Sequence, residues 1–213
     1  MSRGFTLLEL LTALAVLAMI ALMLLGSTHY GIAVWRRTDA LAATAGELAL
    51  SRAILAHDLG NAFPEWHVEP PGVSRIAFDG GPDRATFLAP APASMGGAGL
   101  VRYTLAAAGA EGAARLELSA IRELGTSDPP PASVLVDRAA RIELAYWGPG
   151  STGEAPAWQD TWRERAELPS LIRVRVAFVP DDNRRWPDLV VAPRIAVDGT
   201  CGYDPMSFHC RGR

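Results

Sequence analysis

Gly4-Phe5-Thr6-Leu7-Leu8-Glu9-Leu10-Leu11 is the stretch of this sequence that decides its fold. The short basic leader 1–4 precedes Phe5, and an apolar run then continues to Leu25 with Glu9 as its single charged residue. As a helix, this run would be about 31 Å long, close to the ~30 Å hydrocarbon core of a bilayer. The sequence therefore predicts a transmembrane helix over residues 5–26.

The carboxylate of Glu9 is the unusual feature of that run. An ionisable side chain at the middle of a membrane helix costs about 2.5–3.5 kcal/mol, less near an end, and indicates a function with a specific partner. A secretory signal peptide cut near Gly26-Ser27, or a plain single-pass anchor, would also account for the apolar run. Neither alternative explains why Gly4 is followed at once by Phe5 and then by Glu9.

The combination of Gly4, Phe5 and Glu9 resembles the processing site of type IV pilin-like proteins. The resemblance implies that a membrane aspartyl peptidase, the prepilin peptidase, cuts after Gly4 and that Phe5 is then N-methylated. It also implies that Glu9 aligns subunits during assembly. The free amine left at Phe5 would offer a neighbouring subunit's Glu9 an opposite charge, which low dielectric strengthens.

Positive charges on both sides of the apolar run bear on its orientation. Arg3 and the initiator amine favour a cytoplasmic leader, whereas Arg36 and Arg37 count the other way. The resemblance places the chain in the inner membrane as a single-pass protein, with its C-terminal head in the periplasm.

Residues 27–60 continue the helical pattern. Apolar residues recur at spacings near three, four and seven, with charged residues between them, which favours an amphipathic helix. These apolar residues are Trp35, Leu41, Leu48, Ile54, Leu55 and Leu59. Gly60-Asn61 and Pro64 predict where the helix ends. We expect residues 27–60 to form a spine that packs on a sheet.

After Asn61 the pattern changes to short runs separated by Gly and Pro. The predicted strands are Arg75–Phe78, Ala85–Leu88, Leu100–Leu105, Ala114–Ile121, Ser133–Val136, Arg141–Trp147, Leu171–Val179 and Leu189–Ile195. Apolar and polar residues alternate in several of them. Inward positions would be Val101, Tyr103 and Leu105, then Ile142, Leu144 and Tyr146, and finally Ile172, Val174, Val176 and Phe178. This alternation predicts antiparallel sheets with one solvated face.

The fold class predicted is α+β, a pilin-like fold with a β-rich head over residues 61–200. The chain has 213 residues and a formal net charge of -3. About 185 residues outside the membrane segment are enough for one domain with its own core. The charge balance lacks the basic excess of a nucleic-acid surface, so no nucleic-acid partner is expected.

The segment from Arg141 to Phe178 indicates which kind of pilin-like protein this sequence resembles. A strand ends at Trp147-Gly148, a loop carries Trp158 and Trp162, and Leu168-Pro169 precedes a strong strand. This order resembles minor pseudopilin J of type II secretion systems, which implies a filament-tip subunit that contacts minor pseudopilins I and K and the major pseudopilin. The alternatives are a W-like minor pilin of a type IV pilus and a membrane-anchored periplasmic binding domain that does not polymerise.

The spacing of Trp158 and Trp162 allows them to share one face of a helix. We expect this pair to fill the core of the head beneath a loop. Exposure at an assembly interface is the alternative, because Trp is enriched in binding hot spots.

The tail over residues 201–213 contains Cys201 and Cys210, which we expect to form a disulfide in an exported domain. Two free thiols are the alternative. These cysteines and His209 make a poor zinc set, so no metal and no cofactor are expected.

Nothing in the sequence predicts catalysis. The four histidines (His29, His57, His67 and His209) are scattered, and Ser151 lacks the strand-to-helix elbow of a hydrolase. Asp181-Asp182-Asn183 fits a turn better than a calcium loop. We therefore expect a structural assembly protein that is not an enzyme.

Overall fold

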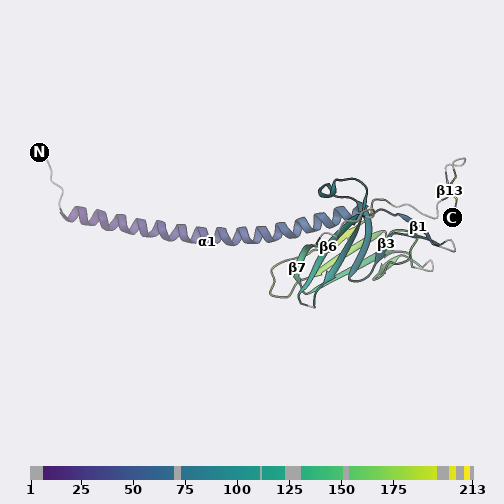
Figure 1. The fold of residues 1–213 in the computed structure, drawn as a ribbon. Coiled ribbons are helices and arrows are strands. Elements are labelled where there is room, and N and C mark those ends of the chain that lie inside the picture. The colour runs from purple at the N-terminus through teal and green to yellow at the C-terminus, as the bar shows by residue number, and fades with distance from the viewer. Residues whose placement is uncertain are drawn as a thin grey trace. The chain divides into compact units, whose positions relative to one another are not determined.

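The computed structural model describes residues 7–69, 73–110, 112–122, 131–150, 154–195, 202–204 and 209–211. The chain divides into two compact units, Met1–Glu47 and Leu48–Arg213. Helix α1 (Leu7–Gly60) begins in the first unit and ends in the second, and strands make up most of the remainder (Figure 1). The predicted α+β class, a helix followed by antiparallel sheets, is confirmed.

Within the described residues, no helix combines the length and the apolar composition that crossing a membrane requires.

Helix α1 ends at Gly60, as its sequence predicts. The backbone N–H of Asn61 donates to the His57 carbonyl (3.0 Å), which closes the last turn. The final turns bury Leu48, Leu55 and Leu59 in the core of the second unit. Ser51 lies in the same buried stripe, and its hydroxyl donates to the Leu135 carbonyl (2.6 Å). This bond satisfies the buried hydroxyl of Ser51. The apolar periodicity of the helix does not predict that Ser51 is buried.

The larger sheet is a five-stranded antiparallel meander in the order β3-β4-β5-β6-β7. Its strands are β3 (Phe78–Gly80), β4 (Arg84–Pro90), β5 (Leu100–Ala108), β6 (Ala114–Arg122) and β7 (Ser133–Ala139). A one-turn 3₁₀ helix, η1 (Ala93–Met95), lies between β4 and β5. A separate hairpin of β1 (Trp66–Glu69) and β2 (Val73–Ile76) precedes the sheet.

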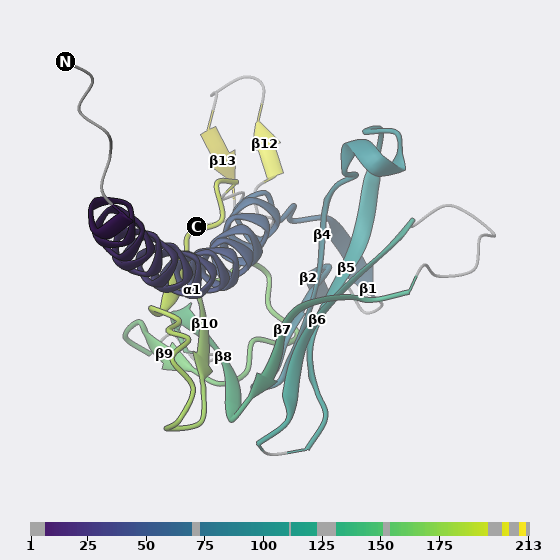
Figure 2. The same cartoon turned by 90° about the vertical axis from the view of Figure 1, so that its left-hand side faces the viewer.

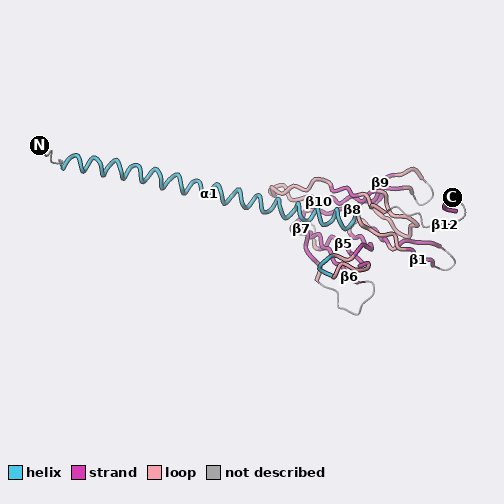
Figure 3. Tube along the Cα trace, turned by 90° about the horizontal axis from the view of Figure 1, so that it is seen from above, coloured by secondary structure: helices cyan, strands magenta, loops and turns pink. Residues whose placement is uncertain are grey.

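The smaller sheet has the order β11-β10-β8-β9 and is also antiparallel throughout. Its strands are β8 (Arg141–Gly148), β9 (Ala157–Gln159), β10 (Leu171–Ala177) and β11 (Leu189–Val191), and Figures 2 and 3 show β8, β9 and β10 side by side. Near the C-terminus, β12 (Gly202–Asp204) and β13 (His209–Arg211) form a second hairpin.

A single residue, Ala140, separates β7 in one sheet from β8 in the other. Its N–H donates to the Ala177 carbonyl (2.8 Å), and its own carbonyl accepts from the Gly112 N–H (3.2 Å). Both backbone groups of Ala140 are therefore satisfied where the chain changes sheets.

One apolar core joins both sheets and the last turns of α1. Every inward position predicted for the three alternating strands is buried except Phe178, which is half-buried. The largest fully buried side chains are Trp162 and Tyr146, and each has its polar atom bonded. The Trp162 indole N–H donates to the Glu167 carbonyl (2.9 Å), and the Tyr146 hydroxyl donates to the Gly81 carbonyl (2.9 Å).

Three sequence-based predictions are wrong. The strand expected over Arg75–Phe78 is split at Ala77, whose N–H donates to Glu65 outside the sheets. The strand expected over Leu189–Ile195 ends at Val191, shortly before Pro193, which has no N–H for a ladder. Trp158 and Trp162 do not share a helix face, since Trp158 lies on strand β9 and Trp162 forms an isolated bridge with Gly80.

Candidate functional site

The first turns of helix α1 carry an apolar surface with one carboxylate. Glu9 lies in the first described turn, where its carbonyl accepts a hydrogen bond from the Thr12 hydroxyl (3.0 Å). Large apolar side chains surround it on all sides of the helix and are 50–78% exposed. These side chains are Leu7, Leu8, Leu10, Leu11, Leu14, Val16, Leu17, Met19, Ile20, Leu22 and Met23. Such a continuous exposed apolar surface indicates contact with a membrane or with other helices.

Gly4 and Phe5, the residues predicted for cleavage and methylation, lie outside the described residues. The same holds for Cys201 and for the side chain of Cys210, whose backbone lies in β13, so their disulfide stays a prediction. Among the described residues, no three histidine, cysteine or acidic side chains gather where they would hold a metal ion.

Arg184 is a largely buried cation in the connection between β10 and β11. Its guanidinium lies 2.8 Å from a carboxylate oxygen of Asp182 and 2.8 Å from one of Asp137 on β7, and it stacks 4.3 Å above the Phe178 ring. Hydrogen bonds from Arg184 lower the pKa of Asp182. At Asp137, burial acts to raise the pKa, but Arg184 and Arg138 outweigh it and the pKa is lowered. The expected turn at Asp181-Asp182-Asn183 is thus held by an ion pair.

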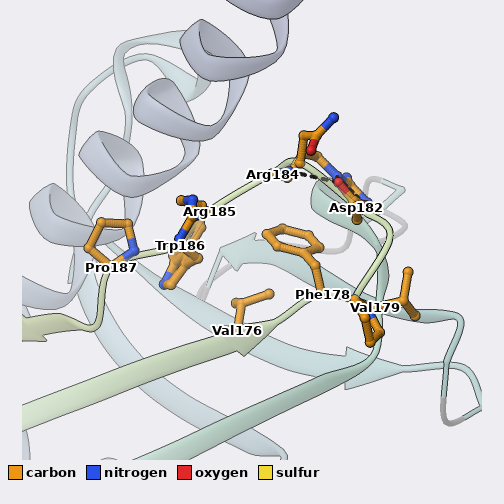
Figure 4. A pocket seen from close by; sticks show the side chains of 10 residues that line it. Val176, Phe178, Val179, Asp182, Arg184, Arg185, Trp186 and Pro187 are labelled. Atoms are coloured by element: carbon orange, nitrogen blue, oxygen red, sulfur yellow. Dashed lines mark hydrogen bonds and ion pairs between the residues drawn. The ribbon is translucent and has the colours of Figure 1, made fainter.

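The same connection borders an open hollow of about 550 Å³. Figure 4 shows Trp186 and Phe178 on either side of it with Val176 between them, and Arg184 bonded to Asp182 at one side. The Trp186 indole N–H is used internally, since it donates to the Val174 carbonyl (3.2 Å). The Arg52 guanidinium lies 5.2 Å from the Trp186 ring and donates to the Pro187 carbonyl. These contacts fix the loop, and the carboxylate that lines the hollow, Asp182, is paired with Arg184.

The outer face of the smaller sheet carries aromatic and cationic side chains together. Trp147 on β8 is paired with Trp158 on β9, and their rings meet edge to face with centroids 5.6 Å apart. The Arg173 guanidinium on β10 lies 4.4 Å from the Trp158 ring centroid. All three side chains are half-buried. The sequence singled out Trp158 but not its contact with Arg173, although the alternation of β10 put Arg173 on the solvated face.

Trp162 has the opposite environment. It is 1% exposed, as the core prediction required, and the Arg165 guanidinium lies 4.9 Å from its ring. Arg165 also donates to the side-chain oxygen of Gln159 (2.9 Å). Trp162 therefore lies in the core, whereas Trp158 lies on the outer face of the smaller sheet.

The first 25 residues match the prokaryotic N-terminal methylation motif, the signal of type IV pilins and pseudopilins. The match supports a pilin-like protein, and the helix followed by antiparallel sheets is consistent with that fold. This motif is typical of structural proteins and not of an enzyme family. No curated protein matches the chain.

Proposed function

We propose that this chain is a minor pseudopilin of a type II secretion system. It would be a structural subunit at the tip of a periplasmic pseudopilus that helps to export folded proteins. The observation that carries the proposal is the methylation motif over residues 1–25, which leads into a helix whose exposed apolar surface contains one carboxylate, Glu9.

The proposed maturation explains that carboxylate. Prepilin peptidase cuts after Gly4, and the new terminal amine of Phe5 is methylated. When subunits assemble, the amine of one chain meets Glu9 of another within an apolar helix bundle. The pairing offsets the cost of taking either charge out of water, so correct axial alignment is favoured over other registers.

The proposed topology follows from the same segment. The leader 1–4 is removed, residues 5–26 span the inner membrane, and residues 27–60 form the helical spine. The head over residues 61–200 lies in the periplasm, where the tail 201–213 can close a disulfide between Cys201 and Cys210. Such a short loop contributes about 2–3 kcal/mol to stability if the bond is unstrained.

The segment from Arg141 to Phe178 supports a J-like pseudopilin over a pilus subunit. Strand β8 carries the aromatic Trp147 next to its last residue, and the chain after β9 inserts Trp162 into the core before β10 begins. The partners proposed are minor pseudopilins I and K, the major pseudopilin and the prepilin peptidase.

Deleting the gene separates the proposed function from its alternatives. Loss of exoprotein secretion with normal pili supports the pseudopilin. Loss of twitching or of pili, with normal secretion, identifies a W-like minor pilin of a type IV pilus. If neither process changes, the chain is a membrane-anchored periplasmic binding domain that does not polymerise, and the proposal is wrong.

Glu9→Ala tests the proposed alignment directly. We expect the variant to insert into the membrane normally, while its co-purification with other pilin-like subunits falls at least about tenfold because the buried pair loses a partner. Glu47→Ala is the matched control, since Glu47 is an exposed carboxylate of the same helix. Unchanged co-purification of Glu9→Ala would contradict the role assigned to Glu9.

A further inference from the structure

The solvated face of the smaller sheet is divided into two halves of different chemistry. In one half, the strand register places Leu171 beside Trp147 and Trp147 beside Trp158. In the next row across β8, β10 and β11, Arg173 and Val190 flank the position of Ala145, which is buried (4% exposed). Val190 is 46% exposed. We call Trp147, Trp158, Leu171, Arg173 and Val190 the Trp–Arg face.

The other half consists of charges that neutralise one another. Arg175 lies beside Glu143 in the register, and its guanidinium donates to the Asp188 carboxylate (2.8 Å) and approaches Glu143 (3.8 Å). Arg141 also pairs with Glu143 (2.7 Å). An apolar and aromatic centre beside a charged border is the usual composition of a protein–protein interface.

Arg173 differs from Arg175 two positions along the same strand. Its guanidinium is laid against the Trp158 ring at 4.4 Å, and within the described residues it forms no ion pair. Stacking on an aromatic ring holds the planar group in place while its N–H donors remain available at the edge. Arg and Trp fixed in this way have the composition of a binding hot spot.

We propose that the Trp–Arg face is the surface through which the head docks a neighbouring protein subunit, and that the docked segment presents a carboxylate to Arg173. A carboxylate matches the forked donors of a guanidinium in two parallel hydrogen bonds. Apolar side chains flanking that carboxylate would cover Leu171, Trp147 and Val190. Because the partner is taken to be another subunit of the assembly, the inference rests on the function proposed above.

The border of the face favours a protein carboxylate over a polyanion. Arg141 and Arg175 neutralise Glu143 and Asp188, so Arg173 is the one cation without an ion pair among the described residues of this face. A nucleic acid or an anionic lipid surface binds through several cations. A single Asp or Glu on an apolar segment needs only one guanidinium. Charge complementarity therefore selects an acidic peptide segment.

Photo-crosslinking of the full chain in its own membrane tests the proposal. The probe p-benzoylphenylalanine is placed at Val190 on the Trp–Arg face, and at Ile121 on β6 (39% exposed) as the control position. We expect Val190 to crosslink a pilin-like subunit at a peptide that contains Asp or Glu, identified by mass spectrometry. We expect Ile121 to give no such product.

Charge reversal then tests the chemistry. Arg173→Glu should lower the yield of the Val190 crosslink at least about tenfold, because a docked carboxylate would meet a like charge. Changing the mapped Asp or Glu of the partner to Lys should restore it. Arg115→Glu on the larger sheet is the matched control and should leave the yield unchanged, since that side chain is 53% exposed and, within the described residues, its ion pair is with Glu117 on the same strand. Circular dichroism checks that the head of each variant is folded. If Arg173→Glu does not fold, Arg173→Gln replaces it in the same measurement.

Three results would overturn the docking face. The first is a folded head whose Val190 probe crosslinks only lipid or nothing. The second is a crosslinked partner peptide without Asp or Glu, and the third is a Val190 crosslink yield in Arg173→Glu equal to that of the unchanged chain. If Glu9→Ala disrupts assembly while Arg173→Glu does not, the proposed function stands and this inference fails. If Val190 crosslinks only proteins that are not pilin-like subunits, this inference fails, because its partner is another subunit of the assembly.

Discussion

At the level of single residues, Gly148 leaves less room for a side chain than any other described glycine, because the Trp162 ring packs against it. A Cβ added at Gly148 would lie 2.3 Å from the Trp162 ring, and Trp162 is 1% exposed and tied to the Glu167 carbonyl. The indole has no room to withdraw. We therefore expect Gly148→Ala to lower the free energy of unfolding by about 1–3 kcal/mol, measured by denaturant unfolding of the full chain.

Gly46→Ala provides the control for that substitution. A Cβ at Gly46 would meet nothing within 4 Å, and the residue lies inside helix α1. Alanine should stabilise the helix there by up to about 1 kcal/mol. Equal effects of the two substitutions on stability would mean that Trp162 does not occupy the space above Gly148.

Asp58 gives a pH dependence whose sign can be worked out. Burial raises the pKa of its carboxyl above 3.8, and His57 partly offsets the shift. The folded state then holds the proton to a higher pH than the unfolded state, so the contribution of Asp58 to stability declines as pH rises through this range. Asp58→Asn should raise the melting temperature at pH 7 and leave it unchanged at about pH 3. The opposite order would contradict the burial of this carboxyl.

At the scale of elements, Arg184 connects the β10–β11 loop to β7 through Asp182 and Asp137. Both carboxyls have lowered pKa values in the folded state. Their contribution to stability is therefore complete above the unfolded value of 3.8 and is lost as pH falls through the folded values.

Arg184→Gln should remove part of that acid sensitivity. We expect the variant to be less stable at neutral pH and to approach the unchanged head once the pH has fallen through the lowered pKa values of Asp137 and Asp182, where the carboxyls of both are protonated. Melting curves across this range measure the effect. Arg185→Gln is the control, because Arg185 is an exposed arginine of the same loop and forms no ion pair within the described residues. A constant difference between Arg184→Gln and the unchanged head at all pH values would contradict the ion-pair account.

The elements that the sequence predicted well are those whose burial alternates. Strands β5, β8 and β10 each have one face in the core, so period-two apolar residues mark them clearly. The strands that were missed, β1, β9, β12 and β13, are three or four residues long, too short for a period-two pattern to distinguish them from loops. The predicted helix face shared by Trp158 and Trp162 is wrong because a four-residue spacing indicates a helix only where the surrounding residues also follow a helical pattern.

The candidate site also contains residues that the sequence predicts and contacts that it does not. Gly4, Phe5 and Glu9 are recognisable because the signal is local in sequence. The contact of Arg173 with Trp158 joins residues on different strands, and its two partners become neighbours only through the pairing of β8 with β9 and with β10. Ser51 is similar, since its partner is a carbonyl 84 positions away.

At the scale of the whole molecule, the division after Glu47 predicts which fragment folds alone. The unit Leu48–Arg213 contains its own core, to which α1 contributes Leu48, Leu55 and Leu59. A fragment of residues 48–213 should unfold cooperatively on heating. A fragment of residues 61–213 lacks those three leucines and should show no cooperative transition. Equal melting behaviour would mean that the helix is dispensable for the core.

The intact mass of the protein extracted from membranes tests the central claim, that this chain is a processed, pilin-like assembly subunit. We expect a chain that begins at Phe5 and carries one methyl group on its amine. A chain that keeps Met1, or one cut near Gly26, would contradict it and would leave the head as an anchored or secreted domain.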